Sequence, residues 1–351
     1  MTLSLGRIAG IPVRLHWSAL LVAAYLAYSL GSIVSLVAVA VGVVCFGLSI
    51  LFHELGHALV ASRCGVATTS IDLWALGGVA RLASEARAPK EEAMIAAAGP
   101  AASALSAVIC GIAWWILPVQ GVPGEIGRVL LWLAYLNTAL AVFNMLPGSP
   151  LDGGRVLRAA RWKIHGDRVR ASRESARSGV VVGSLIVLIA VALSIRGQSQ
   201  LSLLLVGFFV LGNARAELTF AEMQQRSSST QVGSLAWRFL AEFDERTSVT
   251  VALDDVSRVG DAEALIATSE DQQVGLVLVE HVLRIPEEEH DTTILSDLVR
   301  PFSTFPHARS EDHVSEFLAA LDPIDPVILL MDNGKVEGLV PPTRLRNLLE
   351  I

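Results

Sequence analysis

The sequence predicts a polytopic α-helical membrane domain over residues 1–221, followed by a soluble α+β domain over residues 232–351. Hydrophobic residues make up 52% of the chain and its mean hydropathy is +0.54, which is too apolar for a single soluble globule. Charge is also unevenly distributed: residues 1–221 carry 17 Lys and Arg against 10 Asp and Glu, whereas residues 222–351 carry 10 against 24. This asymmetry predicts a domain boundary, with a linker at 222–231. The acidic second half argues against nucleic acid as a partner.

Stretches without Asp, Glu, Lys or Arg predict about six transmembrane helices. Residues 17–52 form a charge-free stretch of 36 residues, which suits two closely joined helices with a turn at Gly31 and Ser32, because one span needs about 20 residues. The other four helices are expected at 93–124, 129–151, 179–195 and 197–211.

Residues 68–82, between the second and third predicted helices, favour a short β-hairpin. They combine β-branched residues with the Gly77-Gly78 pair, which is typical of strands joined by a turn. Beside a membrane site, a hairpin is tolerated only where protein covers it or water borders it. One interpretation is an edge strand that pairs with an extended substrate segment. The alternative is a plain loop.

The second predicted helix ends in a His-Glu-x-x-His motif formed by His53, Glu54 and His57. Residues four apart lie one turn apart on one face of a helix, so both imidazoles can reach one Zn²⁺. Glu54 is then close enough to accept a proton from the water that zinc activates. The alternative is a buried helix with two hydrogen-bonded histidines. Ionisable residues at the end of an apolar span are costly, however, and usually mark a site.

A second polar motif follows the fourth predicted helix and reads Asn144-x-x-Pro147-x-x-x-Leu151-Asp152-Gly153. Its prolines and glycines end the helix and expose backbone at membrane depth, which requires a cavity or a partner. A catalytic zinc takes three protein ligands and leaves one position for water, so Asp152 is the candidate third ligand. The alternative is that Asp152 caps the next helix.

The distribution of positive charge predicts the orientation in the membrane. Eight Lys and Arg lie between Arg155 and Arg177, whereas the loop at 118–128 carries Arg128 alone. Basic loops stay cytoplasmic, so we expect a multi-pass protein of the cell membrane with both termini and the C-terminal domain in the cytoplasm. This orientation places His53 and Asp152 at the same depth.

The C-terminal domain reads as one unit repeated twice, over residues 232–290 and 292–350. Each copy is expected to contain a strand, a polar turn and a second strand, at 274–285 and at 327–340. Short amphipathic helices are expected before them, at 261–266 and 312–321.

The two motifs of the membrane half, over about residues 1–215, resemble those of the site-2 protease family of intramembrane zinc metalloproteases. The resemblance implies one Zn²⁺ per chain with His53, His57 and Asp152 as ligands, Glu54 as the base and Asn144 as a polar group near the substrate or oxyanion. It also implies an active site toward the cytosol. Where relatives often have Asn, this chain has Ser103, to which the resemblance assigns no role.

The C-terminal half is similar to a tandem CBS pair, the accessory module of one subgroup of that family. Such pairs commonly associate, so a homodimer through this module is expected. The acid that holds a nucleotide ribose in these modules is replaced here, where the chain reads Gly338-Leu339-Val340-Pro341-Pro342-Thr343-Arg344. Weak or absent adenine-nucleotide binding is therefore expected, with a regulatory or dimerising role.

The sequence thus predicts hydrolysis of peptide bonds within or beside a transmembrane helix of another membrane protein, in the lipid bilayer. Two other classes remain open: a membrane zinc carrier or sensor, and a catalytically silent scaffold. Glu54 separates them from the protease, because a carrier needs no general base between two ligands and a silent relative usually loses a ligand or the base.

Overall fold

The computed structural model describes residues 2–31, 34–74, 77–116, 121–197, 200–237, 241–259, 263–270, 272–332 and 335–349. The chain forms two compact units, Met1–Ala221 and Glu222–Ile351. Each unit has its own core, and each is described by itself.

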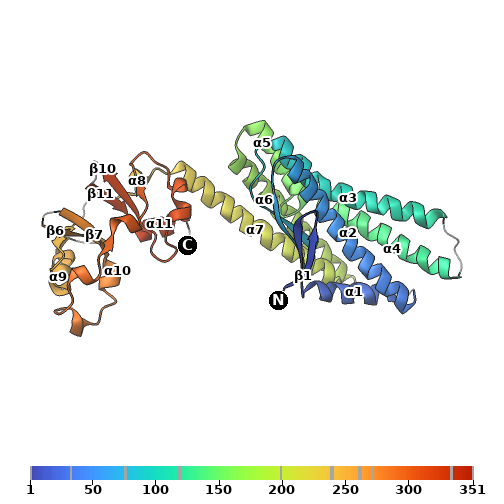
Figure 1. Cartoon of the computed structure of the whole chain (residues 1–351), viewed down its shortest axis with the longest axis horizontal. Coiled ribbons are helices and arrows are strands. Elements are labelled where there is room, and N and C mark those ends of the chain that lie inside the picture. The colour runs from blue at the N-terminus through green and yellow to red at the C-terminus, as the bar shows by residue number, and fades with distance from the viewer. Residues whose placement is uncertain are drawn as a thin grey trace. The chain divides into compact units, whose positions relative to one another are not determined.

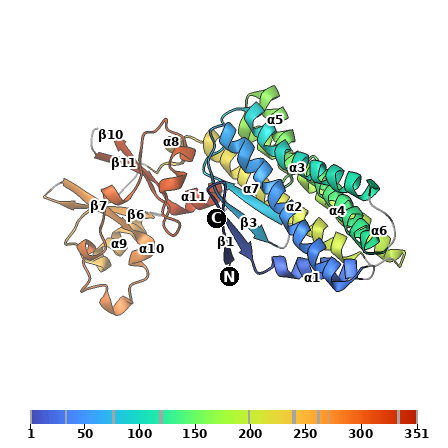
Figure 2. The same ribbon diagram turned by 45° about the vertical axis from the view of Figure 1, so that its right-hand side comes forward.

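Helices dominate the first unit, and in Figures 1 and 2 the long helices α2, α3 and α4 run side by side. Among the described residues, five helices are long and apolar enough to cross a membrane, whereas α1 has 13 residues. The helical membrane fold is therefore confirmed. The helices of this unit are α1 (Ala19–Gly31), α2 (Leu36–Arg63), α3 (Pro89–Ile116), α4 (Gly121–Asn144), α5 (Asp152–His165), α6 (Arg168–Ile195) and α7 (Leu201–Ser229).

Several helices extend beyond the apolar stretches that predicted them. α6 begins at Arg168, ahead of the expected 179, and α7 continues through Ser229, over most of the predicted linker. Hydropathy identifies only the part of a helix that lies in the hydrocarbon layer, so it does not detect the polar ends of these helices. In contrast, α4 ends at Asn144 rather than at 151, ahead of Pro147 and Pro150. α1 ends at Gly31, and Ser32 of the predicted turn lies outside the described residues.

A four-stranded sheet lies beside α2 (Figure 2). Its order is β1 (Thr2–Ile8), β2 (Ile11–His16), β3 (Thr68–Trp74) and β4 (Gly77–Leu82), with β2 parallel to β3. The hairpin expected at 68–82 is confirmed, while β1 and β2 were not predicted. Ile71 and Leu73 of β3 pack with Leu51 and Ala58 of α2 in one buried cluster. This cluster fixes the hairpin against the helix that carries the His-Glu-x-x-His motif.

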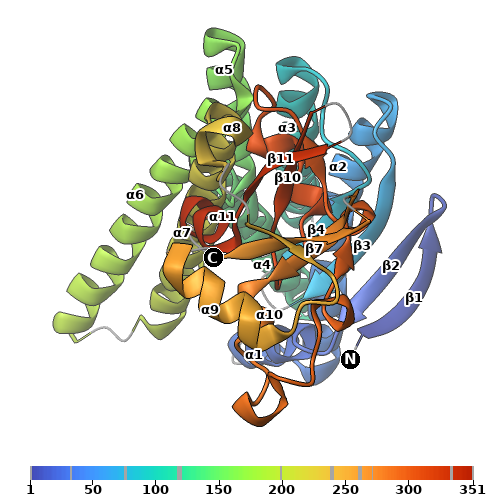
Figure 3. The ribbon, with the colours of Figure 1, turned by 90° about the vertical axis from the view of Figure 1, so that its left-hand side faces the viewer.

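The second unit contains two small mixed sheets, and Figure 3 shows strands of both. One has the order β5 (Ala241–Asp244), β6 (Ala264–Ser269), β7 (Gln272–Leu278) and β8 (Arg300–Pro301), and the other has the order β11 (Lys335–Val340), β10 (Ile328–Asp332) and β9 (His307–Ala308). A buried cluster that includes Ile266, Leu276, Leu329 and Leu339 joins the two sheets. The helices of this unit are α8 (Val232–Leu235), α9 (Val249–Val259), α10 (Val279–Val282) and α11 (Pro342–Leu349). The expected α+β class is confirmed.

Local predictions for this unit were only partly right. The strand pair at 327–340 is confirmed as β10 and β11, and 312–321 contains two short 3-10 turns, Val314–Glu316 and Leu318–Ala320. The strand pair at 274–285 was wrong, because β7 ends at Leu278 and α10 follows. The helix at 261–266 was wrong over its last three residues, which begin β6; residues 261 and 262 lie outside the described part. Short apolar runs do not separate helix from strand, and pairing with β5 and β7 decides the outcome here.

The α6–α7 contact depends on small residues, which gives a first prediction. A Cβ on Gly183 would lie 2.7 Å from Leu211 N and 2.9 Å from Leu211 Cα, which are backbone atoms of the facing helix. We expect Gly183→Ala to destabilise the protein by about 1–3 kcal/mol, because the helices must separate. The measurement is the melting temperature of the detergent-purified protein.

Gly212→Ala is the matched control. Gly212 is also helical, and a Cβ there would meet nothing within 4 Å, so Ala should be neutral or stabilising. Equal melting temperatures for the two variants would contradict close packing at Gly183.

Candidate active site

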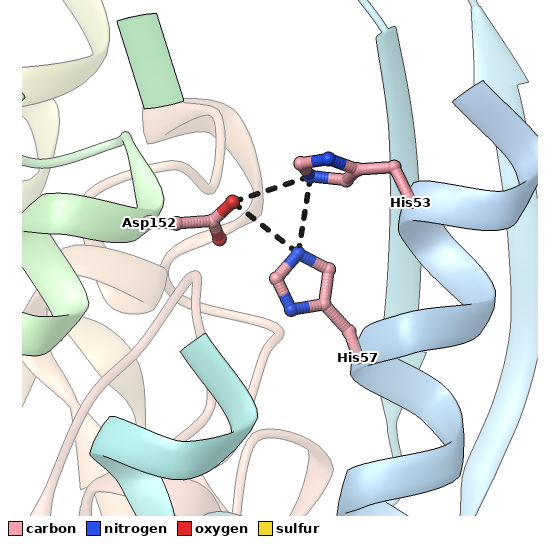
Figure 4. Close-up of side chains that lie close together, drawn as sticks. All are labelled: His53, His57 and Asp152. Carbon is pink, nitrogen blue, oxygen red and sulfur yellow. Dashed lines mark hydrogen bonds and ion pairs between the residues drawn. The ribbon is translucent and has the colours of Figure 1, made fainter. Parts of the chain in front are cut away.

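The two histidines of α2 and Asp152 of α5 converge on one point (Figure 4). The Nε2 atoms of His53 and His57 are 3.2 Å apart, and each lies 3.3 Å from Asp152 Oδ2. Both histidines are buried, and the Asp152 side chain is 13% exposed. The structure therefore brings Asp152 to two histidines that lie nearly 100 positions earlier in the chain.

Asp152 reaches the histidines because the preceding segment folds tightly under α5. The helix is capped at Leu151, so Asp152 occupies its first turn and is not the N-cap residue that the alternative interpretation required. A Cβ on Gly153 would collide with backbone of Met145 and Leu146, and a Cβ on Gly154 with backbone of Gly148 and Ser149. Both glycines are thus needed for this loop to pass so close to the helix.

The geometry of the three atoms fits a tetrahedral zinc ion. With Zn–N bonds of about 2.0–2.1 Å and Zn–O bonds of about 2.0–2.2 Å, two ligand atoms of a tetrahedral site are separated by roughly 3.3–3.5 Å. The observed separations are 3.2, 3.3 and 3.3 Å. These atoms meet this requirement without rearrangement of the backbone.

The chemistry of the three atoms also suits a shared metal cation. His57 Nδ1 donates a hydrogen bond to the carbonyl oxygen of Ile95 at 2.7 Å, so in the neutral ring Nε2 carries a bare lone pair. His53 Nδ1 lies 2.9 Å from Ser103 Oγ, and the tautomer in which Nδ1 donates to this hydroxyl leaves its own Nε2 bare. Two lone pairs and a carboxylate oxygen then face one another, and a shared metal ion resolves the repulsion.

Asp152 is in the form that a metal ligand needs. Burial alone would raise the pKa of its carboxyl, but when protons rather than a metal ion occupy the facing Nε2 atoms of His53 and His57, their hydrogen bonds outweigh burial and hold the pKa well below its usual range. Asp152 is therefore a carboxylate at neutral pH.

Glycines leave space for the reacting side chains. A Cβ on Gly99 of α3 would lie 2.6 Å from the Nε2 atom of His53 and would also collide with His57. A Cβ on Gly78 of β4 would collide with the Glu54 side chain. Glu54 is buried, and its Oε2 accepts a hydrogen bond from the backbone N–H of Ala80 at 2.9 Å. The hairpin therefore holds the carboxylate beside the two histidines.

A cavity of about 200 Å³ opens onto this cluster. Its lining includes each candidate site residue identified in the sequence, namely His53, Glu54, His57, Asn144 and Asp152, together with the edge of β4 from Gly77 to Ala80. The arrangement combines a metal-binding triad, a carboxylate that can accept a proton and an amide at the end of α4. This set of groups can add water to a polarised carbonyl.

Sequence reasoning assigned no role in the site to three contributors. Ser103 contacts His53, Ala80 contacts Glu54, and Arg155 lines the cavity. Of these, Arg155 carried a usable signal, because it lies three residues after Asp152 on the same helix and so on the same face.

Comparison with known proteins identifies relatives over the whole chain. The model of peptidase family M50 matches residues 41–123 and 119–190. The chain is 34% identical to the putative zinc metalloprotease Rip3 of Mycobacterium tuberculosis over 372 residues, covering 99% of this chain and 92% of Rip3.

Two solved structures are each similar to a part of the chain. The site-2 protease from Methanocaldococcus jannaschii matches with 30% sequence identity and a TM-score of 0.48, covering 62% of this chain and 95% of that protein. The CBS domain of the bacterial CNNM/CorC family Mg²⁺ transporter matches with 15% identity and a TM-score of 0.30, covering 41% of this chain and 93% of that structure.

The hydrogen bond to His53 gives a second prediction. Ser103→Ala removes the group that orients the His53 ring, and the loss of such an outer contact typically weakens metal binding by about 10–100-fold. The measurement is the zinc dissociation constant of the purified protein in competition with a chelator.

Ser106→Ala is the matched control, one turn further along α3. Ser106 Oγ donates to the carbonyl oxygen of Ala102 within its own helix at 3.1 Å, away from the histidines. Zinc affinity should stay unchanged in this variant. A Ser103→Ala protein that binds zinc as tightly as Ser106→Ala would remove Ser103 from the metal site.

Proposed function

The chain belongs to peptidase family M50, and on that premise we propose that it cleaves peptide bonds within or beside transmembrane helices of other membrane proteins. The expectation of a zinc metalloprotease of the site-2 type is confirmed by this membership. One observation carries the proposal for this chain: a metal-binding triad and a buried glutamate share a cavity within a unit of membrane-spanning helices.

In the proposed mechanism His53, His57 and Asp152 hold one zinc ion per chain. Bound zinc would polarise the scissile carbonyl and lower the pKa of its bound water toward about 7. Ser103 and the Ile95 carbonyl keep the two imidazoles oriented, with each Nε2 directed at Asp152.

Glu54 serves as the general base and then as the general acid. Its carboxylate accepts the proton of the attacking water and transfers it to the nitrogen of the leaving amine. The Ala80 N–H fixes one carboxylate oxygen, so the side chain keeps its orientation during the transfer. We propose that the Asn144 amide, which lines the cavity, donates a hydrogen bond to the substrate carbonyl.

The substrate segment is proposed to pair with the edge of β4. β4 is the last strand of its sheet, and the Ala80 N–H points to Glu54 and therefore away from β3. Backbone groups two residues away on an antiparallel strand point the same way, so Gly78 also presents its backbone to the cavity. A transmembrane helix must unwind before its peptide bonds can be cut, and strand pairing with β4 offsets the lost helical hydrogen bonds.

A second, apolar cavity supports a membrane-embedded substrate. It measures about 150 Å³, shares Ile50 and Gly77 with the first cavity, and is lined by residues of α1, α2, β2 and β3. Apolar side chains that flank the cleaved segment fit this cavity, while the segment itself lies along β4.

We also propose that both termini and the second unit are cytoplasmic. The basic residues between 155 and 177 support this orientation, since they lie on α5 and on the first part of α6. It would place α5, and with it Asp152, at the cytosolic side of the membrane unit.

For residues 232–351 we propose a CBS-like module, with repeats at 232–290 and 292–350, that regulates or dimerises the enzyme and does not bind adenine nucleotides. Its shared buried cluster between the two sheets agrees with two repeats folded against each other. Arg344, at the position of the expected ribose-binding acid, donates to the carbonyl oxygen of Leu235 at 2.9 Å and lies over the ring of Trp237. A fixed cation at this position cannot accept the hydroxyl hydrogen bonds of a ribose.

Co-expression with candidate single-span membrane proteins tests the protease function. Wild type should yield a truncated product, and Glu54→Gln should reduce its rate of formation by about 10²–10⁴-fold, because an amide cannot accept the proton. Zinc content, measured by elemental analysis after dialysis, should persist in Glu54→Gln and fall in Asp152→Ala.

These measurements separate the protease from its two rivals. Cleavage at the wild-type rate by Glu54→Gln would refute Glu54 as the base. A wild type that binds zinc but cleaves no candidate, with zinc transport unaffected by Glu54→Gln, would favour the carrier.

The second unit gives a prediction of its own. Residues 222–351, which contain their own cores, should form a soluble dimer that binds neither ATP nor AMP at millimolar concentration. Sedimentation measures the first property and calorimetry the second. A monomer would refute dimerisation through this unit, and micromolar binding of either nucleotide would refute the interpretation of Arg344.

A further inference from the structure

The three arginines along one face of α5 differ in their partners. Arg158 forms hydrogen bonds to Glu92 and lies 3.5 Å from Glu217, and Arg161 forms an ion pair with Glu174. Arg155 lies one turn closer to Asp152 and lines the active-site cavity. Within the described part of the chain, the Arg155 side chain forms no hydrogen bond or ion pair with another residue, whereas its backbone N–H donates to the carbonyl oxygen of Leu151.

An unpaired cation in such a place is costly. Taking a charge out of water without a partner costs several kcal/mol, so buried charges are normally paired. Arg155 is partly buried, and burial lowers the pKa of its guanidinium, although the nearby carboxylates of Asp152, Glu92 and Glu54 act in the opposite direction. Arginine nonetheless stays protonated in proteins. The Arg155 guanidinium therefore keeps hydrogen-bond donors available to a group that enters the cavity.

The position of Arg155 indicates what that group is. Residues three apart on a helix have Cβ atoms about 5–6 Å apart on one face, so Arg155 stands next to Asp152. Glu54 and Asn144 line the same cavity. In the proposed active state, the carboxylates of Asp152 and Glu54 balance a zinc dication, and Arg155 supplies one positive charge in excess.

We propose that Arg155 is a catalytic residue that donates hydrogen bonds to the oxygen of the scissile carbonyl and stabilises the negative charge that forms there. The proposal rests on the proteolytic function proposed above. Guanidinium is suited to this task, because it offers several N–H donors in a fixed plane and keeps its charge. A preorganised cation in a water-poor cavity acts where charge develops and needs no rearrangement during the reaction.

The water oxygen forms a bond to the carbonyl carbon, the π electron pair of the carbonyl moves to its oxygen, and Glu54 takes the water proton. Arg155 then faces one full negative charge on that oxygen. When the carbon–nitrogen bond breaks, the oxygen returns its electron pair to the carbon, the nitrogen keeps the pair of the broken bond, and Glu54 gives the nitrogen its proton.

Two other roles predict different behaviour. A purely structural arginine would be needed for folding or zinc retention, which is the role that the contacts of Arg158 already indicate. An arginine that recognises an acidic side chain of the substrate would bind the ground state and the transition state equally. Its loss would raise KM and leave kcat unchanged.

The experiment uses the full-length enzyme and a substrate that wild type cleaves in the co-expression test. Arg155→Met should lower kcat by about 10²–10³-fold, as the loss of one oxyanion donor does elsewhere, with KM changed little. Zinc content and melting temperature should stay at wild-type values. Arg161→Met, the same substitution on the same helix outside the cavity lining, is the control and should retain wild-type kcat.

Chemical rescue keeps the proposal testable if Arg155→Met folds poorly. Arg155→Ala leaves space in the cavity wall, and added ethylguanidinium should restore part of kcat, whereas ethylammonium should restore less. Wild-type kcat in the Arg155 variants, a change confined to KM, or a loss explained by lower zinc content would each overturn the proposal. If wild type cleaves none of the candidates, the protease function fails and this inference with it.

Discussion

Three hydrogen-bond acceptors that face one another within 3.3 Å impose the strongest constraint on the membrane unit. Without a shared cation, two imidazole lone pairs and a carboxylate repel each other, so the fold must hold them together. α2 supplies both histidines at a spacing that the helix itself fixes. Asp152 comes from another helix, and its position depends on how α5 is anchored. The geometry of the site therefore depends mainly on the contacts that fix α5 against α2 and α3.

Close backbone packing and buried charge together provide that anchoring. Gly153 and Gly154 let the loop that ends α4 pass under the first turn of α5. Two turns later, Arg158 binds the buried carboxylate of Glu92 on α3. Because removing one partner of such a pair leaves a buried charge uncompensated, the bridge resists movement of α5 away from α3. The position of Asp152 thus depends on the loop before α5 and on an ion pair at the middle of this short helix.

The chemistry of the site could be predicted from the sequence, because most of it resides in local spacing. His53, Glu54 and His57 lie on one helix, and Asp152 was found by counting the ligands that a catalytic zinc requires. Ser103 could not be found this way. Its contact with His53 depends on the register between α2 and α3, which no local pattern encodes. β1 was missed because its side chains are exposed along its length, so it lacks the alternation that marks a half-buried strand.

The errors in the second unit also arise where the structure depends on contacts between distant segments rather than on local sequence patterns. Residues 264–266 are apolar and short, and they are equally compatible with a helix or a buried strand until their neighbours are known. Pairing with β5 on one side and β7 on the other makes them the centre of a sheet. At Arg344, in contrast, the sequence alone supported a prediction. A basic residue at the position of the expected ribose-binding acid argued against a ribose site before the contacts of Arg344 were known. Its hydrogen bond to Leu235 and its place over Trp237 add a physical reason, because these contacts give this cation partners within its own chain.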